Sequence, residues 1–175
     1  EIIEALLESR GVEDFYEFLN PSSEELIPFE KLKNIDRAAE IILNTIDNDG
    51  TFLVYYDTDC DGISAGTVMT RYLRNYTDKV KTYINERKQH GIENFDYGNL
   101  IEVDTVIIVD SINEEPQLYR DLLSQGVHVV VVDHHLIPKK LAESDVDICL
   151  VSSANDYPNP ALSGSATTWK LCSYI

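Results

Sequence analysis

The chain has 175 residues, of which 31 are acidic and 14 basic, so its formal net charge at pH 7 is −17. This charge argues against a protein that holds nucleic acid by a basic surface alone, because nucleic acid is itself a polyanion. Three widely spaced cysteines disfavour a disulfide scaffold and favour a reducing, cytoplasmic location, and no apolar run reaches the roughly 18 residues that a membrane span needs.

The predicted elements begin with an N-terminal helical lead over residues 1–34 and a helix over residues 35–47, where apolar side chains recur at helical spacing. Beyond them, β-branched apolar runs predict strands at 51–56, 80–85, 105–110, 127–133 and 147–151. Helices are predicted at 62–76, at 114–125 and from Ser163 to residue 175. Strands that are apolar on both faces and alternate with helices predict an α/β fold, with a Rossmann-like, mostly parallel five-stranded sheet flanked by helices.

The charge is unevenly distributed along the chain. Residues 1–50 hold thirteen acidic side chains against four basic ones, whereas residues 71–88 hold six basic side chains against two acidic ones. Both stretches fit solvated helix and loop faces. The basic stretch also fits a phosphate-attracting patch at the edge of a binding crevice, and the sequence leaves both interpretations open.

Acidic and histidine side chains follow three of the predicted strands. Asp57, Asp59 and Asp61 follow the first strand, Asp110 ends the third, and Asp133, His134 and His135 lie at the end of the fourth. Ligands of open α/β sheets bind beyond the carboxyl ends of the strands. We therefore expect these side chains to converge on one crevice.

Three carboxylates at alternate positions repel one another, so their crowding favours a bound cation. An EF-hand calcium loop starts in the same way, but its twelfth position should be a glutamate and is Val68 here. Carboxylates combined with one or two imidazoles suit Mn²⁺ or Mg²⁺ better than zinc. Several carboxylates, with one placed to bridge, suggest two ions, which would support hydrolysis of a phosphoester or phosphoanhydride.

The three clusters together resemble the first three motifs of the DHH phosphoesterase superfamily, in order and in placement at strand ends. Within it, the chain is similar to the RecJ-like single-strand-specific exonucleases. Phe18-Leu19-Asn20-Pro21 resembles the N-terminal lead of that branch, and Tyr157-Pro158 and Leu162-Ser163-Gly164 resemble its segment after the third motif. The resemblance implies that residues 35–175 are a DHH catalytic domain, with a fourth metal-binding motif and a DHH-associated domain beyond residue 175.

The resemblance also implies a role for each residue that matches a motif. Asp59 and Asp61 would each hold one ion, Asp110 would bridge both, and His134 would bind the second ion. His135 would contact the scissile phosphate, Asp133 would orient the histidines, and Asp57 would be a ligand or a neighbour of one. The implied substrate-binding residues are Arg87, His90, Gly91, Ser163 and Gly164.

The activity implied by the resemblance is metal-dependent hydrolysis of single-stranded DNA from an end, 5′ to 3′, in repair and recombination. A single-strand-binding protein or a helicase is the expected protein partner. Two alternatives stay open: a phosphodiesterase of cyclic dinucleotides or short oligonucleotides, and a non-catalytic scaffold subunit of a replication complex. The Phe-Leu-Asn-Pro lead favours the exonuclease over the first, and the retained acids and histidines disfavour the second.

Overall fold

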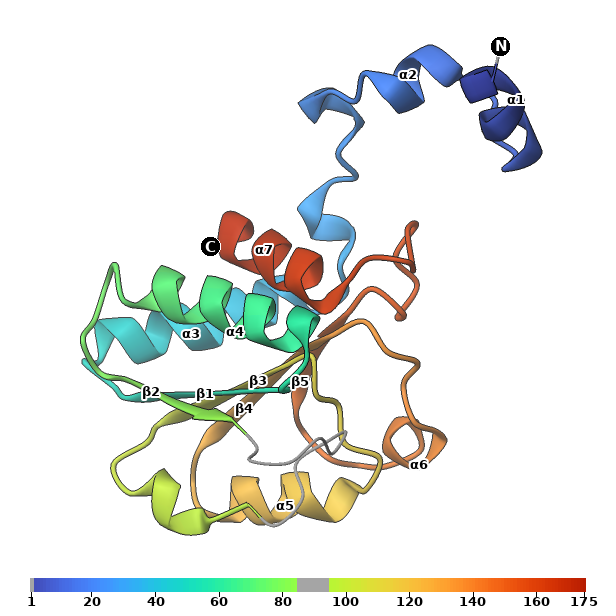
Figure 1. The fold of residues 1–175 in the computed structure, drawn as a ribbon. Coiled ribbons are helices and arrows are strands. Elements are labelled where there is room, and N and C mark those ends of the chain that lie inside the picture. The colour runs from blue at the N-terminus through green and yellow to red at the C-terminus, as the bar shows by residue number, and fades with distance from the viewer. Residues whose placement is uncertain (1, 85–94) are drawn as a thin grey trace.

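The computed structural model describes residues 2–84 and 95–175, and its centre is a five-stranded sheet (Figure 1). The strands are β1 (Phe52–Tyr56), β2 (Val80–Ile84), β3 (Thr105–Val109), β4 (His128–Asp133) and β5 (Cys149–Ser152). Their order is β2-β1-β3-β4-β5, and every neighbouring pair is parallel. The predicted α/β fold is confirmed, with a sheet that is parallel throughout.

Helices cover both faces of the sheet. The described part of the chain holds α1 (Ile2–Ser9), α2 (Phe15–Leu19), α3 (Ile35–Asp47), α4 (Cys60–Leu73), α5 (Pro116–Ser124), α6 (Lys139–Ala142) and α7 (Gly164–Tyr174), of which α1 and α2 lie in the N-terminal lead. Figure 1 shows α3, α4 and α7 on one face and α5 on the other. Within the described part of the chain, no helix is both long and apolar enough to cross a lipid bilayer.

Two hydrophobic clusters, one on each side of the sheet, fix its position between the helices. Val54, Ile107 and Val130 belong to the cluster under α3, α4 and α7, whereas the next residue of each strand belongs to the cluster that includes α5. Successive side chains of a strand point to opposite faces, so a strand with helices on both sides must be apolar throughout. This explains the four consecutive valines of β4.

The start of α4 differs from the sequence prediction. The helix begins at Cys60 rather than Gly62 because Asp59 is its N-cap, and Asp59 Oδ1 accepts a hydrogen bond from Gly62 N at 2.9 Å. As a result, Asp61 lies in the first turn of a helix rather than in a loop. The short helix α6 was not predicted, since four residues carry no readable periodicity.

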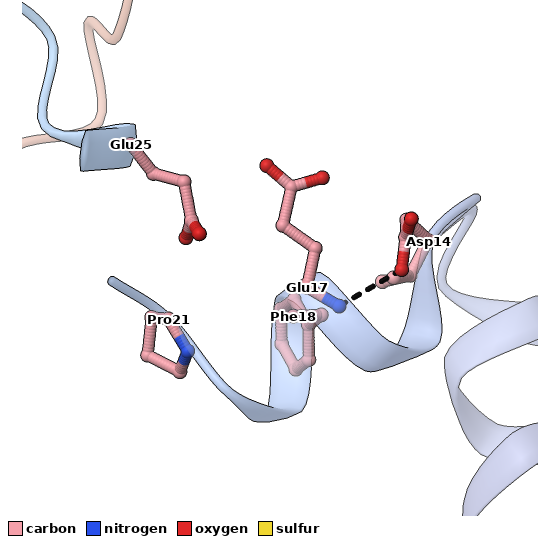
Figure 2. A pocket seen from close by; sticks show the side chains of 6 residues that line it. Asp14, Glu17, Phe18, Pro21 and Glu25 are labelled. Carbon is pink, nitrogen blue, oxygen red and sulfur yellow. Dashed lines mark hydrogen bonds between the residues drawn. The ribbon is translucent and has the colours of Figure 1, made fainter. Parts of the chain in front are cut away.

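The N-terminal lead extends away from the sheet in Figure 1. It leaves several large apolar side chains exposed, among them Ile2 and Tyr16. A pocket of about 480 Å³ lies within the lead, and Figure 2 shows Glu17, Phe18 and Glu25 in its lining. None of the residues predicted to bind metal or substrate lines this pocket.

A buried lysine ties the lead to the body of the protein. Lys170 of α7 is 4% exposed, and its Nζ donates a hydrogen bond to the Ile27 carbonyl at 2.9 Å. The same ammonium lies 4.7 Å from the centre of the Phe29 ring. Tyr157 Oη donates to the same Ile27 carbonyl at 3.2 Å. Hydrogen bonding and cation–π attraction thus hold residues 27–29 against α7.

Lys170→Ala is expected to lower the free energy of unfolding by about 2–4 kcal/mol, because it removes the charge-assisted hydrogen bond, the cation–π contact and buried methylene groups. Lys170→Met retains most of the apolar contact and should cost about half as much. Urea denaturation followed by circular dichroism measures both values. Equal unfolding free energies for Lys170→Met and the unmodified chain would show that the ammonium does not stabilise the fold.

Candidate metal centre

The acids that follow β1, β3 and β4 lie at one edge of the sheet. These strands are adjacent, parallel and nearly in register, since Val109 pairs with both Tyr56 and Val132. The chain therefore leaves all three strands at the same level. This brings Asp110 next to Asp133 and its two histidines, as the sequence predicts.

Asp110 combines an unusual backbone conformation with a buried side chain. Its backbone has a φ of 54°, in the left-handed region that non-glycine residues rarely adopt, and the residue is 2% exposed. Among the described residues, its Oδ1 has no hydrogen-bond partner, although it lies 3.3 Å from His134 Nε2 and 3.9 Å from His135 Nδ1. Burial, followed by the negative charges of Asp133 and Asp61, raises the pKa of Asp110 to about 7. A buried carboxylate oxygen in this position is a strong candidate to bind a cation.

Asp133 is fully buried and holds the two histidines. Its Oδ1 accepts hydrogen bonds from His134 N at 2.6 Å, His135 N at 2.8 Å and His135 Nδ1 at 2.7 Å, and its Oδ2 accepts one from Ile112 N at 2.6 Å. Burial acts to raise the pKa of Asp133, but the hydrogen bonds from His135 and His134 outweigh it and keep the pKa below its ordinary value. With both oxygens engaged in this way, Asp133 is placed to orient the imidazoles.

The two imidazoles have different surroundings. The hydrogen bond to Asp133 raises the pKa of His135 to about 9, against the effect of burial. His134 Nε2 instead lies between two carboxylates, 3.3 Å from Asp110 Oδ1 and 3.6 Å from Asp61 Oδ2. The ring centroids of the two histidines are 4.3 Å apart.

Asp61 reaches across to the beginning of α7. Its Oδ2 accepts a hydrogen bond from Gly164 N at 2.7 Å, and its Oδ1 accepts one from Ser165 N at 2.9 Å. Burial acts to raise the pKa of Asp61, but the hydrogen bonds from Ser165 and Gly164 outweigh it and lower the pKa. Ser163 and Gly164 are substrate-binding residues by the resemblance, and in this structure the group bound at their helix start is the Asp61 carboxylate. Ser165 was missed, because a backbone N–H has no side-chain signature.

The arrangement fits a divalent cation. The ligand atoms of Asp110, His134 and His135 all lie within 4.8 Å of one another. Two ligands about 2.1 Å from one ion and 90–120° apart are separated by roughly 3.0–3.6 Å. The observed 3.3 Å and 3.6 Å between His134 Nε2 and the oxygens of Asp110 and Asp61 match that spacing. Mixed carboxylate and imidazole donors suit Mn²⁺, and also Mg²⁺ where water completes the shell.

The first two acids of the cluster lie at the margin of this group. Asp57 is 5% exposed, and its Oδ1 accepts a hydrogen bond from Thr58 N at 2.6 Å. Asp59 caps α4, and its negative charge contributes to raising the pKa of both Asp110 and His135. Asp59 therefore lies close enough to Asp110 and His135 to act on them electrostatically, whereas Asp57 is held in the turn that follows β1.

The interpretation of the basic stretch as a phosphate-attracting patch at the edge of the crevice is wrong for its described residues. Since α4 runs back to the amino edge of the sheet, Arg71 and Arg74 lie at the far end of this helix from Asp61. Lys79 pairs with Asp49 at 2.6 Å, and Lys81 Nζ donates to the Ile101 carbonyl at 2.6 Å. The predicted substrate-binding residues Arg87, His90 and Gly91 lie outside the described residues.

Fold and site together define an α/β protein with a carboxylate–imidazole cluster at the carboxyl edge of a parallel sheet. The family model "DHH family, N-terminal domain" matches residues 51–174. The chain belongs to this DHH family.

Its relatives include named exonucleases. The chain is 29% identical over 174 residues to the SPbeta prophage-derived single-strand DNA-specific exonuclease YorK of Bacillus subtilis, covering 97% of this chain and 29% of the relative. It is 27% identical over 154 residues to the Bacillus subtilis single-stranded-DNA-specific exonuclease RecJ, covering 82% of this chain and 19% of the relative. The chain thus spans less than a third of the length of these relatives.

The fold is similar to that of solved RecJ structures. RecJ of Thermus thermophilus in complex with Mn²⁺ matches with a TM-score of 0.73 and 25% identity, over 95% of this chain and 23% of the other. An exonuclease RecJ bound to manganese matches with a TM-score of 0.70 and 23% identity, over 84% of this chain and 38% of the other.

Proposed function

We propose that this domain binds two Mn²⁺ or Mg²⁺ ions and supplies the metal centre of a single-strand-specific DNA exonuclease that acts 5′ to 3′. The observation that carries the proposal is the buried Oδ1 of Asp110, which has no hydrogen-bond partner in residues 2–84 and 95–175 and lies 3.3 Å from His134 Nε2 in a chain of the DHH family. The manganese named for the RecJ structures and the single-stranded DNA named for the sequence relatives support the choice of metal and substrate.

The role proposed for each ligand is the one that its match to a DHH motif implies. Asp110 would bridge the ions, His134 would bind one of them, and Asp59 and Asp61 would complete the two sites, with Asp57 as a further ligand or neighbour. Ions held by these residues would supply activation of a water molecule and neutralisation of the charge that develops during in-line attack on phosphorus.

The remaining polar groups would handle the substrate. His135 Nδ1 is engaged by Asp133, which leaves Nε2 for the scissile phosphate. Ser163 and Gly164, at the start of α7, would line the path of the strand together with Arg87, His90 and Gly91. Because the chain has a net charge of −17, most of the affinity for DNA would come from other parts of the complete protein.

The cysteines of the chain favour a cytoplasmic setting for this activity. Cys60, Cys149 and Cys172 are free thiols, which suits a reducing cytoplasm. A single-strand-binding protein or a helicase would present strand ends in repair and recombination.

The test is hydrolysis of end-labelled single-stranded DNA, duplex DNA and a cyclic dinucleotide by the complete gene product in Mn²⁺. We expect mononucleotides from the single strand, and none after addition of EDTA. His134→Ala should lower the rate by more than about 100-fold, since it removes a ligand and even residues that only orient ligands contribute 10–100-fold. His128→Ala, an exposed histidine at the opposite edge of the sheet, should not change it.

Other outcomes would identify the alternatives. Preferential cleavage of the cyclic dinucleotide would indicate a DHH phosphodiesterase of small nucleotides. Mn²⁺ binding without hydrolysis of any of the three substrates would indicate a non-catalytic scaffold.

A further inference from the structure

The first turn of α7 contacts two carboxylates of the proposed metal centre. Asp61 comes from α4 and accepts hydrogen bonds from the Gly164 and Ser165 amides at 2.7 Å and 2.9 Å. Ser163, the N-cap of the helix, accepts a hydrogen bond from Ala166 N at 3.1 Å and so fixes this turn. Both oxygens of Asp61 are thereby oriented by backbone groups that cannot rotate away.

Gly164 also limits the position of Asp110. A Cβ atom built at Gly164 would lie 2.5 Å from Asp110 Oδ1 and 2.8 Å from Asp110 Cβ, which is closer than such atoms can approach. Only glycine therefore allows the helix start to lie against this carboxylate. The same residue donates its N–H to Asp61, so it joins a ligand from α4 to a ligand that follows β3.

The geometry points to a positioning role for the first turn of α7: residues 163–165 act as a clasp that sets the separation of Asp61 and Asp110 and thereby the affinity for metal. This inference rests on the proposed metal centre. It assigns to Ser163 and Gly164 a structural task distinct from contact with the substrate. The clasp also joins α7 to α4, the helices that pack together most extensively.

A coupling between metal binding and α7 follows from this arrangement. If docking of the first turn favours the metal-binding positions of Asp61 and Asp110, then metal must favour docking of that turn by the same factor. Metal should therefore slow the opening of the helix start, including the Gly164 and Ser165 amides. Orienting groups around metal ligands typically contribute 10–100-fold to affinity.

The first test is calorimetric titration of the 175-residue chain with Mn²⁺. Gly164→Ala is expected to weaken binding by about 10–100-fold. The matched control is Gly50→Ala, which adds a Cβ 2.9 Å from Thr45 Cγ2 at the opposite edge of the sheet and should leave Mn²⁺ affinity unchanged. If Gly164→Ala binds Mn²⁺ as tightly as the unmodified chain does, the positioning role of residues 163–165 is contradicted, while the proposed metal centre is not.

The second test uses the unmodified chain and does not depend on the folding of a variant. Hydrogen–deuterium exchange by mass spectrometry should show slower exchange over residues 164–166 with Mn²⁺ than with EDTA. Unchanged exchange there, in a chain that binds Mn²⁺, would also overturn the clasp. A chain that takes up no Mn²⁺ at millimolar concentration would instead overturn the proposed metal centre itself.

Discussion

Asp110→Asn is expected to abolish metal-dependent hydrolysis and at the same time to stabilise the metal-free protein. The loss of rate should exceed about 100-fold, because the variant lacks the bridging carboxylate. The gain in stability arises because the buried Asp110 charge lies near Asp133 and Asp61 without a hydrogen-bond partner on Oδ1 among the described residues. Removing that charge should raise the free energy of unfolding by about 2 kcal/mol, or the melting temperature by roughly 4–8 °C.

The pH dependence identifies the cause of this stabilisation. The Asp110 carboxyl has a pKa of about 7 in the folded chain but about 3.9 when unfolded. The stability that its protonated form contributes is therefore complete below about pH 4 and lost as the pH rises to about 7. In EDTA, the advantage of Asp110→Asn should be large at pH 8 and small at pH 5, as measured by thermal denaturation. Equal gains at the two pH values would contradict a charge effect.

Asp133→Ala is expected to lower the free energy of unfolding more than the other substitutions proposed for this chain. Its carboxylate is completely buried and accepts hydrogen bonds from three backbone amides, those of Ile112, His134 and His135, and from the His135 imidazole. Truncation removes the buried acceptor that these four donors share and should cost about 3–5 kcal/mol, which lowers the melting temperature by roughly 10 °C or more. Differential scanning calorimetry in EDTA measures the change without a contribution from metal.

The matched control is Asp145→Ala. The Asp145 side chain is 90% exposed and pairs with Arg120 at 2.8 Å, and such surface pairs contribute less than about 1 kcal/mol. A similarly small loss for Asp133→Ala would mean that water replaces the carboxylate as the acceptor. Asp133 would then not be what holds the two histidines in place.

For the Asp110 and Asp133 variants, the sequence identifies the residues and the structure explains the size of the expected effects. Asp110 and Asp133 were identified from the sequence alone, because an acid after a buried apolar run marks the carboxyl end of a parallel strand, where ligands bind. That pattern does not show that Asp110 Oδ1 is buried without a hydrogen bond among the described residues. It also does not show that both oxygens of Asp133 accept hydrogen bonds. Both depend on the chain segments that pass over the strand ends.

The basic stretch illustrates where sequence reasoning failed. Arg71, Arg74, Lys79 and Lys81 are close in sequence to the aspartate cluster, which suggested that they border the crevice. A helix that connects parallel strands must return the chain to the opposite edge of the sheet, and α4 carries these residues there. Proximity along the chain was therefore a poor guide to proximity in space.

The sequence by itself determined the parallel α/β architecture and most of the residues at the candidate centre, since hydrophobic periodicity and acids at strand ends are local signals. Tertiary structure alone decided that Asp61 binds the start of α7, that Gly164 lies against Asp110, and that three backbone amides donate hydrogen bonds to Asp133. These contacts join residues as far as 104 positions apart, as between Asp61 and Ser165, and two of them use backbone amides. Backbone amides occur at almost every position, so only folding specifies which of them meets a carboxylate.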